Sequence, residues 1–270
     1  MKTNDGVKTS RRAFLRAAGT AVTGLALGAL PYAARTASGA DAGLKIGVIG
    51  SGRIGSTLGA LWLKAGHEIM FSSLDIEHDK ALAARLGGKA RAGTSREAAA
   101  FGEVLLMAVP YAALPQLGRD LADLIGGKVV IDACNPIPAR DGDIATWARN
   151  KGAGLASAEL LPGARIVRAF NAIGYARLPE ASQRQGERTG MPMASDDANA
   201  IAVASRLVRE IGFEPVVVGP LTMGKYLIPG TPLAGEHTPE KIRQIVPTLD
   251  RKSTRLNSSH IQKSRMPSSA

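Results

Sequence analysis

The chain has 270 residues, of which 45% are hydrophobic and 21% charged, which is an ordinary composition for a folded protein. This composition argues against a disordered chain and against a multi-pass membrane protein. The net charge of +11 lies mainly at the ends. Residues 1–40 hold six basic and one acidic side chain (+5) and residues 250–270 hold five and one (+4), which leaves +2 for residues 41–249. No basic stripe with interleaved aromatic residues remains, so we expect no nucleic-acid partner.

The first 40 residues have the pattern of an export signal. Ser10–Arg16 reads SRRAFLR, with the paired arginines of a twin-arginine signal, and a weakly apolar stretch follows as far as Leu30. A small residue, Ala40, suits cleavage by a signal peptidase. We therefore expect residues 1–40 to be a signal peptide read by the twin-arginine export machinery, and the protein to be periplasmic or otherwise extracytoplasmic. An uncleaved signal that anchors the protein to the membrane is the alternative.

The last 21 residues, 250–270, are expected to lie outside the fold. They are rich in serine and basic residues, and one choice of codons for residues 250–260 resembles a sequencing adapter. We interpret the segment as a non-native tail produced by read-through, with a natural disordered tail as the alternative. The expected folded domain is therefore residues 41–249.

Cysteine and histidine usage limits the other sources of stability. The chain has one cysteine, Cys134, so no intramolecular disulfide can form. The four histidines are scattered without the spacing of metal ligands. We expect no metal site.

Short apolar runs and helical patterns alternate along the folded region. The expected strands cover residues 44–50, 68–71, 102–109, 128–132, 164–170, 191–194 and 214–218, and the expected helices include residues 54–65, 80–86, 114–125, 156–161 and 197–211. Strands that alternate with helices of this length predict an α/β fold with a mostly parallel, doubly wound sheet.

A segment rich in glycine and proline, residues 219–239, follows the last strand and forms a small carboxyl-terminal extension. It contains a possible short helix over residues 222–227. Three interpretations stay open for it: a surface loop, a lid over the site, or the contact surface of a homodimer.

A glycine-rich turn joins the first strand to the first helix, and its six residues are Gly50, Ser51, Gly52, Arg53, Ile54 and Gly55. This is the G-x-G-x-x-G spacing of a dinucleotide-binding turn in its required context between a strand and a helix. The first glycine permits a tight turn, the second lets a pyrophosphate approach the backbone, and the third lets the helix lie close to the strand. The pattern predicts a Rossmann-type fold whose fingerprint residues bind the cofactor.

The end of the second strand indicates which dinucleotide is bound. An NAD-binding chain usually carries an acidic residue there to hold the ribose hydroxyls. This chain has Ser72 and Ser73 instead, which favours the 2′-phosphate of NADP. Asp75, two residues further on, weakens this preference.

The chain resembles the family of deazaflavin-dependent NADP reductases, which pass hydride between NADPH and coenzyme F420. The resemblance spans residues 44–226 and rests on the fingerprint and five further motifs, at residues 108–110, 132–136, 168–171, 195–197 and 219–221. It implies NADP as the cofactor and coenzyme F420 as a co-substrate.

The resemblance also implies roles for particular residues. Ser72 and Ser73 would receive the 2′-phosphate, and a second group would surround the nicotinamide, namely Val109, Pro110, Asn135 and Asn171. The family commonly has an arginine after the serine at the end of the second strand, where this chain has Leu74. The loss of one charged hydrogen bond there costs roughly 1.5 to 3 kcal/mol of cofactor binding.

The leading hypothesis is an NADP-dependent oxidoreductase that reduces or oxidises a small-molecule redox substrate, a deazaflavin or a similar acceptor. Alternatives are reduction of a quinone, a metal ion or an imine, and a non-catalytic module that binds the dinucleotide. No catalytic residue is assigned, because the carriers supply the chemistry of hydride transfer. Asp132, Cys134 and His237 are the remaining candidates, and each is interpreted as structural or solvated.

Overall fold

The computed structural model describes residues 43–249. The predicted export signal and the predicted non-native tail lie outside these residues. Among the described residues, no helix is both long and apolar enough to cross a membrane.

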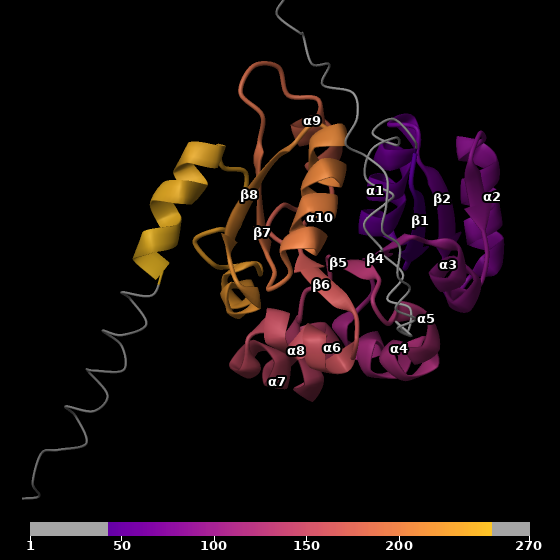
Figure 1. Cartoon of the computed structure of the whole chain (residues 1–270), viewed down its shortest axis with the longest axis horizontal. Helices are drawn as coiled ribbons and strands as arrows, with labels where there is room; N and C mark the ends of the chain where they lie inside the picture. The colour runs from indigo at the N-terminus through magenta and orange to yellow at the C-terminus, as the bar shows by residue number, and fades with distance from the viewer. Residues whose placement is uncertain (1–42, 250–270) are drawn as a thin grey trace, which may run out of the picture. The chain divides into compact units, whose positions relative to one another are not determined.

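One sheet of eight strands organises the fold. The strands are β1 (Lys45–Ile49), β2 (Glu68–Ser72), β3 (Ala90–Ala92), β4 (Val104–Met107), β5 (Val129–Asp132), β6 (Arg165–Arg168), β7 (Gly190–Ala194) and β8 (Glu214–Gly219). Their order is β3-β2-β1-β4-β5-β6-β7-β8, and Figure 1 shows it from β8 on the left to β2 on the right. All neighbours are parallel except β6 and β7, which are antiparallel. The predicted α/β fold with a mostly parallel sheet is confirmed.

Helices cover both faces of the sheet, because buried parallel strands send alternate side chains to opposite sides. In β4, Val104 and Leu106 pack into one core while Leu105 and Met107 pack into the other. The first core includes helices α1 (Arg53–Lys64), α2 (Ile76–Leu86), α9 (Leu178–Ser182) and α10 (Ala198–Glu210). The second includes α3 (Ser95–Phe101), α4 (Leu114–Asp120), α5 (Ala122–Ile125), α7 (Asp143–Lys151) and α8 (Ala153–Leu160).

The region after α2 differs from the sequence-based expectation. It contains the edge strand β3 and the helix α3, both of which the prediction missed, so the predicted strand over residues 102–109 is confined to Val104–Met107. The sequence does carry a signal for α3. Thr94 and Glu97 form a capping box, in which the Thr94 side chain accepts from the Glu97 backbone N–H and the Glu97 side chain accepts from the Thr94 N–H.

Several further helical segments were not predicted, among them α9, η2 (Tyr111–Ala113) and the last helix, over residues 239–249. The expected helix over residues 114–125 is interrupted at Leu121, so α4 and α5 are separate. The short helix α6 (Pro138–Asp141) and the longer α7 were missed. Each of α6 and α7 is followed by a glycine with positive φ, Gly142 at +61° and Gly152 at +93°, a conformation that ends helices.

The carboxyl-terminal extension packs into the fold. A 3-10 helix, η3 (Leu221–Tyr226), contacts α8 and β6, and Leu227 and Leu233 are buried. A last helix over residues 239–249 buries Ile242 in the same small core, beside β7 and β8. The interpretation of residues 219–239 as a plain surface loop therefore does not hold for η3, because its apolar side chains complete the core.

Candidate functional site

The turn between β1 and α1 has the geometry of a dinucleotide-binding turn. Gly50 has φ +99°, a left-handed conformation that glycine adopts freely. The backbone N–H groups of Gly50 and Ser51 both donate to the carbonyl oxygen of Ser72, each at 2.9 Å. These bonds fix the turn to the end of β2.

The other two glycines match the two roles that the fingerprint assigns to them. A Cβ atom at Gly52 would have no atom within 4 Å, so the space above the start of α1 is open. A Cβ at Gly55 would instead collide with the backbone carbonyl of Gly50, so only glycine lets α1 lie this close to the turn. Ile54 packs its side chain against the first core and so holds the first turn of the helix.

The amino-terminal end of α1 carries no side-chain cap. Gly52 is the N-cap residue and cannot accept from the first N–H groups, whereas Asp75, Thr94 and Asp197 cap α2, α3 and α10 in that way. Free N–H groups and the helix dipole at this end bind phosphate. The turn thus fits the pyrophosphate of a dinucleotide.

The two serines at the end of β2 differ in their surroundings. Ser72 is fully buried, and its hydroxyl donates to the carbonyl oxygen of Val48 at 2.8 Å. Ser73 is partly exposed and donates to the buried carboxylate of Asp79 at 2.9 Å. Leu74, at the position of the family's arginine, is fully exposed. Of the two serines predicted to receive the 2′-phosphate, Ser73 alone lies near the surface.

Arg53 reaches from the fingerprint to the loop after β6. Its Nη1 donates to the hydroxyl of Tyr175 at 2.6 Å, and its guanidinium carbon lies 4.9 Å from the centre of the Tyr175 ring. Sequence reasoning did not single out Tyr175, since it is 122 residues from Arg53. The pair places a cation and an exposed aromatic ring beside the predicted pyrophosphate position.

The structure brings Asn135 and Asn171 together at the carboxyl ends of β5 and β6. The Asn135 side-chain amide donates to the Asn171 backbone carbonyl at 3.1 Å, and the Asn171 amide donates to the carbonyl of Cys134 at 3.2 Å. The side-chain oxygen of each asparagine is buried without a hydrogen-bond partner. Phe170, just before Asn171, has φ +63°, a strained conformation for a residue with a side chain.

Val109 and Pro110 lie at the neighbouring strand end. They follow β4 directly, with Val109 packed against the second core and Pro110 exposed at the start of the 3-10 helix η2 (Tyr111–Ala113). In an open α/β sheet, ligands bind at the carboxyl ends of the strands. The carboxyl ends of β4, β5 and β6, where Val109, Pro110, Asn135 and Asn171 lie, are therefore the candidate position for the nicotinamide.

Asp132 and Cys134 have structural roles, as interpreted from the sequence. The Asp132 carboxylate accepts from the Cys134 backbone N–H at 2.9 Å and pairs with Arg168 at 2.6 Å, with both side chains fully buried. Burial raises the pKa of the Cys134 thiol well above its ordinary value. His237 is half-buried beside the carbonyl of Ala234. Arg168 was missed as a separate feature, although it stands directly opposite Asp132 in the sheet register.

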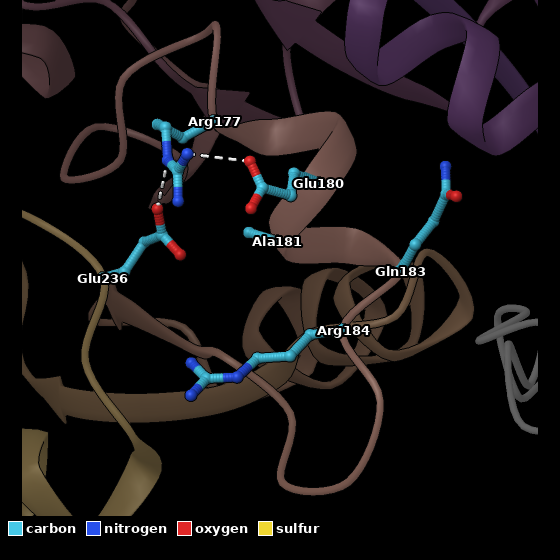
Figure 2. Close-up of a pocket in the computed structure, with 6 residues that line it drawn as sticks. All are labelled: Arg177, Glu180, Ala181, Gln183, Arg184 and Glu236. Carbon is cyan, nitrogen blue, oxygen red and sulfur yellow. Dashed lines mark hydrogen bonds and ion pairs between the residues drawn. The ribbon is translucent and has the colours of Figure 1, made fainter.

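A polar hollow of about 450 Å³ lies beside α9 and was not expected from the sequence. Figure 2 shows Arg177 between Glu180 and Glu236, to which it is bonded at 2.7 Å in each case, with Arg184 at the other side. The two carboxylates both bind the Arg177 guanidinium. Arg184 also lines the hollow and forms no ion pair with Glu180 or Glu236. Within residues 43–249, no group of three or more His, Cys, Asp or Glu side chains is arranged to hold a metal ion.

The fold and the fingerprint geometry define the class: a Rossmann-type domain that fits a dinucleotide. Residues 45–136 match the model of the family described as NADP oxidoreductase, coenzyme F420-dependent. This match covers the fingerprint, the end of β2 and the ends of β4 and β5, and the family's description names NADP as the cofactor.

Two curated relatives are similar over most of the described region. The chain is 29% identical over 204 residues to the F420-dependent NADP reductase of Methanothermobacter thermautotrophicus, covering 70% of this chain and 87% of the relative. It is 28% identical over 184 residues to the rat metalloreductase STEAP3, covering 67% of this chain and 35% of the relative. The chain therefore spans about a third of the length of the rat protein.

Solved structures agree with the fold. A hypothetical protein from Sinorhizobium meliloti is 26% identical with a TM-score of 0.61, covering 73% of this chain and 95% of that one. A protein from Arthrobacter described as a putative F420-dependent NADP reductase is 20% identical with a TM-score of 0.58, covering 68% and 88%. The second likeness shows the fold alone.

Proposed function

We propose that this chain is an NADP-dependent oxidoreductase that transfers hydride between NADPH and a deazaflavin, coenzyme F420, or a similar small redox acceptor. The observation that carries the proposal is the fingerprint turn, in which the space above Gly52 is open and the start of α1 is uncapped. The similarity to the reductase of Methanothermobacter supports the choice of acceptor.

Each part of the site has a role in this proposal. The N–H groups at the start of α1 bind the pyrophosphate, and Ser73 lies beside the adenosine ribose. Val109, Pro110, Asn135 and Asn171 surround the nicotinamide. When bound, the nicotinamide supplies or accepts the hydride. The protein orients the two reactants and excludes water, which is how such sites lower the barrier.

A metal ion is the second candidate acceptor. The observation that favours it is the similarity to a protein named as a metalloreductase. In this version the metal ion is a substrate: one NADPH reduces two ions by one electron each and leaves as NADP+ with release of a proton, and the dinucleotide site is unchanged.

The test is a turnover assay with the full chain. We expect NADPH, followed by its absorbance at 340 nm, to be oxidised in the presence of coenzyme F420, with ferric and cupric chelates, a quinone and a cyclic imine as the other acceptors. Calorimetry on the same protein measures NADPH binding separately. Binding without turnover of any acceptor would favour the non-catalytic binding module over the enzyme.

We also propose that the protein is exported with its cofactor by the twin-arginine machinery, on the strength of the SRRAFLR segment. The twin-arginine pathway carries folded proteins, which suits an enzyme that acquires its cofactor in the cytoplasm. Replacing Arg11 and Arg12 by lysine should leave the protein in the cytoplasmic fraction of the producing cells. Export that persists in the lysine variant would contradict the proposal.

A further inference from the structure

A buried carboxylate links the two sides of the adenosine ribose subsite. Asp79, in the first turns of α2, is fully buried. One of its oxygens accepts from the hydroxyl of Ser51 in the fingerprint, and the other accepts from the hydroxyl of Ser73 after β2 at 2.9 Å. Within the described part of the chain, no lysine, arginine or histidine is within ion-pair distance of Asp79.

These contacts decide where the serine protons point. A hydroxyl group has one proton to donate and two lone pairs to accept with. Ser51 is 1% exposed and its proton is directed to Asp79. Ser73 lies closer to the Asp79 carboxylate, at 2.9 Å, than to its other acceptor, the Asp75 carbonyl, at 3.1 Å. Both protons therefore point inward. One lone pair of the Ser73 oxygen accepts from the Asp75 backbone N–H at 3.1 Å, and the second is left for the ribose.

This arrangement distinguishes the two nicotinamide cofactors. A 2′-phosphate has acceptor oxygens and a negative charge, so it needs donors and cations. A ribose 2′-hydroxyl can donate to an acceptor such as Ser73. A buried negative charge beneath the subsite also repels the phosphate more than the hydroxyl. Leu74, fully exposed, adds no compensating charge.

We propose that Asp79 is a specificity-determining residue of the ribose subsite, which keeps the preference for NADPH over NADH small, so that the protein binds both. The proposal rests on the proposed function, since it assumes that a nicotinamide dinucleotide occupies the fingerprint. Asp79 acts through the two serines by orienting their protons.

The test compares the dissociation constants of NADPH and NADH for the full chain by calorimetry. The two dissociation constants of the wild-type protein should lie within about tenfold of each other. This factor corresponds to the free energy of one charged hydrogen bond at the low end of its range. In Asp79→Asn the charge is lost and the amide donates to one serine, which frees that serine's proton for the phosphate. The preference for NADPH should rise by about tenfold. A purely structural role would weaken both cofactors equally and leave the ratio unchanged.

Asp75→Asn is the matched control. It removes the same charge from the same end of α2, but the Asp75 carboxylate accepts from the His78 N–H and contacts neither serine hydroxyl. Asparagine caps helices as well as aspartate, so α2 should remain intact. The ratio should change far less than in Asp79→Asn. An equal change in both variants would overturn the proton-orienting role.

Two other results would overturn the proposal. One is a wild-type preference for NADPH above about two hundredfold, which is more than one charged hydrogen bond supplies. The other is an unchanged ratio in Asp79→Asn. If circular dichroism shows that Asp79→Asn is unfolded, Ser73→Ala replaces it. That variant removes the outward lone pair, so NADH should weaken several-fold more than NADPH, and equal weakening would count against the proposal. Failure of both cofactors to bind the wild-type protein would contradict the proposed function itself.

Discussion

Asp132 on β5 and Arg168 on β6 are direct neighbours in the sheet register and form a fully buried ion pair at 2.6 Å. Arg168 also donates to the carbonyl oxygen of Leu227 at 3.1 Å, so the pair joins two parallel strands to the carboxyl-terminal extension. Its Nε has no partner in the described residues. The pair lies directly beneath the strand ends that carry Asn135 and Asn171, and so supports the predicted nicotinamide subsite.

Removing one partner of this pair should be strongly destabilising. Arg168→Met leaves the Asp132 carboxylate buried without its cation, a change that costs about 3 to 5 kcal/mol of unfolding free energy. The double variant Asp132→Asn with Arg168→Met removes both charges and should recover most of that loss. Urea denaturation of the wild type, the two single variants Arg168→Met and Asp132→Asn, and the double variant measures the coupling. A loss in the double variant equal to the sum of the two single losses would show that the charges do not interact.

Gly52→Asp should abolish dinucleotide binding. The new side chain would fill the open space above α1 and set a negative charge against the pyrophosphate, which costs several kcal/mol of binding (~1.4 kcal/mol per tenfold). Gly88→Asp is the control, because a Cβ there also meets no atom within 4 Å and φ is +59°, which aspartate tolerates. Calorimetric titration with NADPH compares them, and unchanged affinity in Gly52→Asp would remove the fingerprint from the site.

Leu74→Arg should tighten NADPH binding by about tenfold or more, because a guanidinium can form charged hydrogen bonds to the 2′-phosphate. The exposed Leu74 side chain leaves room for the larger group. NADH affinity should stay within a factor of about two. If the variant instead gains affinity for NADH, the 2′-phosphate does not lie beside residue 74.

Cys134 should be inert in the folded protein. The thiol is fully buried and its pKa is raised well above the ordinary value, mainly by burial. Because the thiolate is the reactive form, modification by iodoacetamide at pH 8 should occur only after unfolding in denaturant. Rapid labelling of the native protein, followed by mass spectrometry, would contradict the buried position.

Acid should remove the contribution of the Asp197 ion pair. The Asp197 carboxylate accepts from the Arg165 guanidinium at 2.6 and 2.8 Å and caps α10. The hydrogen bonds from Arg165 and, to a smaller extent, from the Ala200 N–H lower the pKa of Asp197 well below its usual value. Because the pKa of Asp197 is lower in the folded than in the unfolded protein, the ionised carboxylate stabilises the fold at pH values above the unfolded-state pKa of about 3.9. This contribution to stability is lost as the pH falls toward the folded-state pKa.

The comparison for this prediction is Asp197→Asn, which keeps the cap and loses the charge. It should be less stable than wild type by about 0.5 kcal/mol at pH 7, since both partners are about a third exposed. The difference in urea midpoint should shrink as the pH is lowered below 4. A constant difference between pH 7 and pH 3 would show that the ion pair does not stabilise the fold.

The sequence by itself determined the class of fold and the position of the fingerprint. Both depend on local patterns: apolar runs such as residues 129–131 give buried strands, and the glycines at positions 50 and 55 meet backbone demands that only glycine satisfies there, while Gly52 leaves open space above the helix. The same locality explains the misses. β3 has three residues, too few for an apolar pattern, and α7 is mostly polar, so neither stood out.

Only the tertiary structure decided how the site side chains are partnered. Ser72 and Ser73 are adjacent in sequence and look equivalent, yet β2 turns one hydroxyl to Val48 and the other to Asp79. Tyr175 meets Arg53 across 122 residues, and Asn135 meets Asn171 across 36. Such contacts follow from strand order and helix placement, which depend on the packing of the whole core and leave no trace at a fixed spacing in the chain.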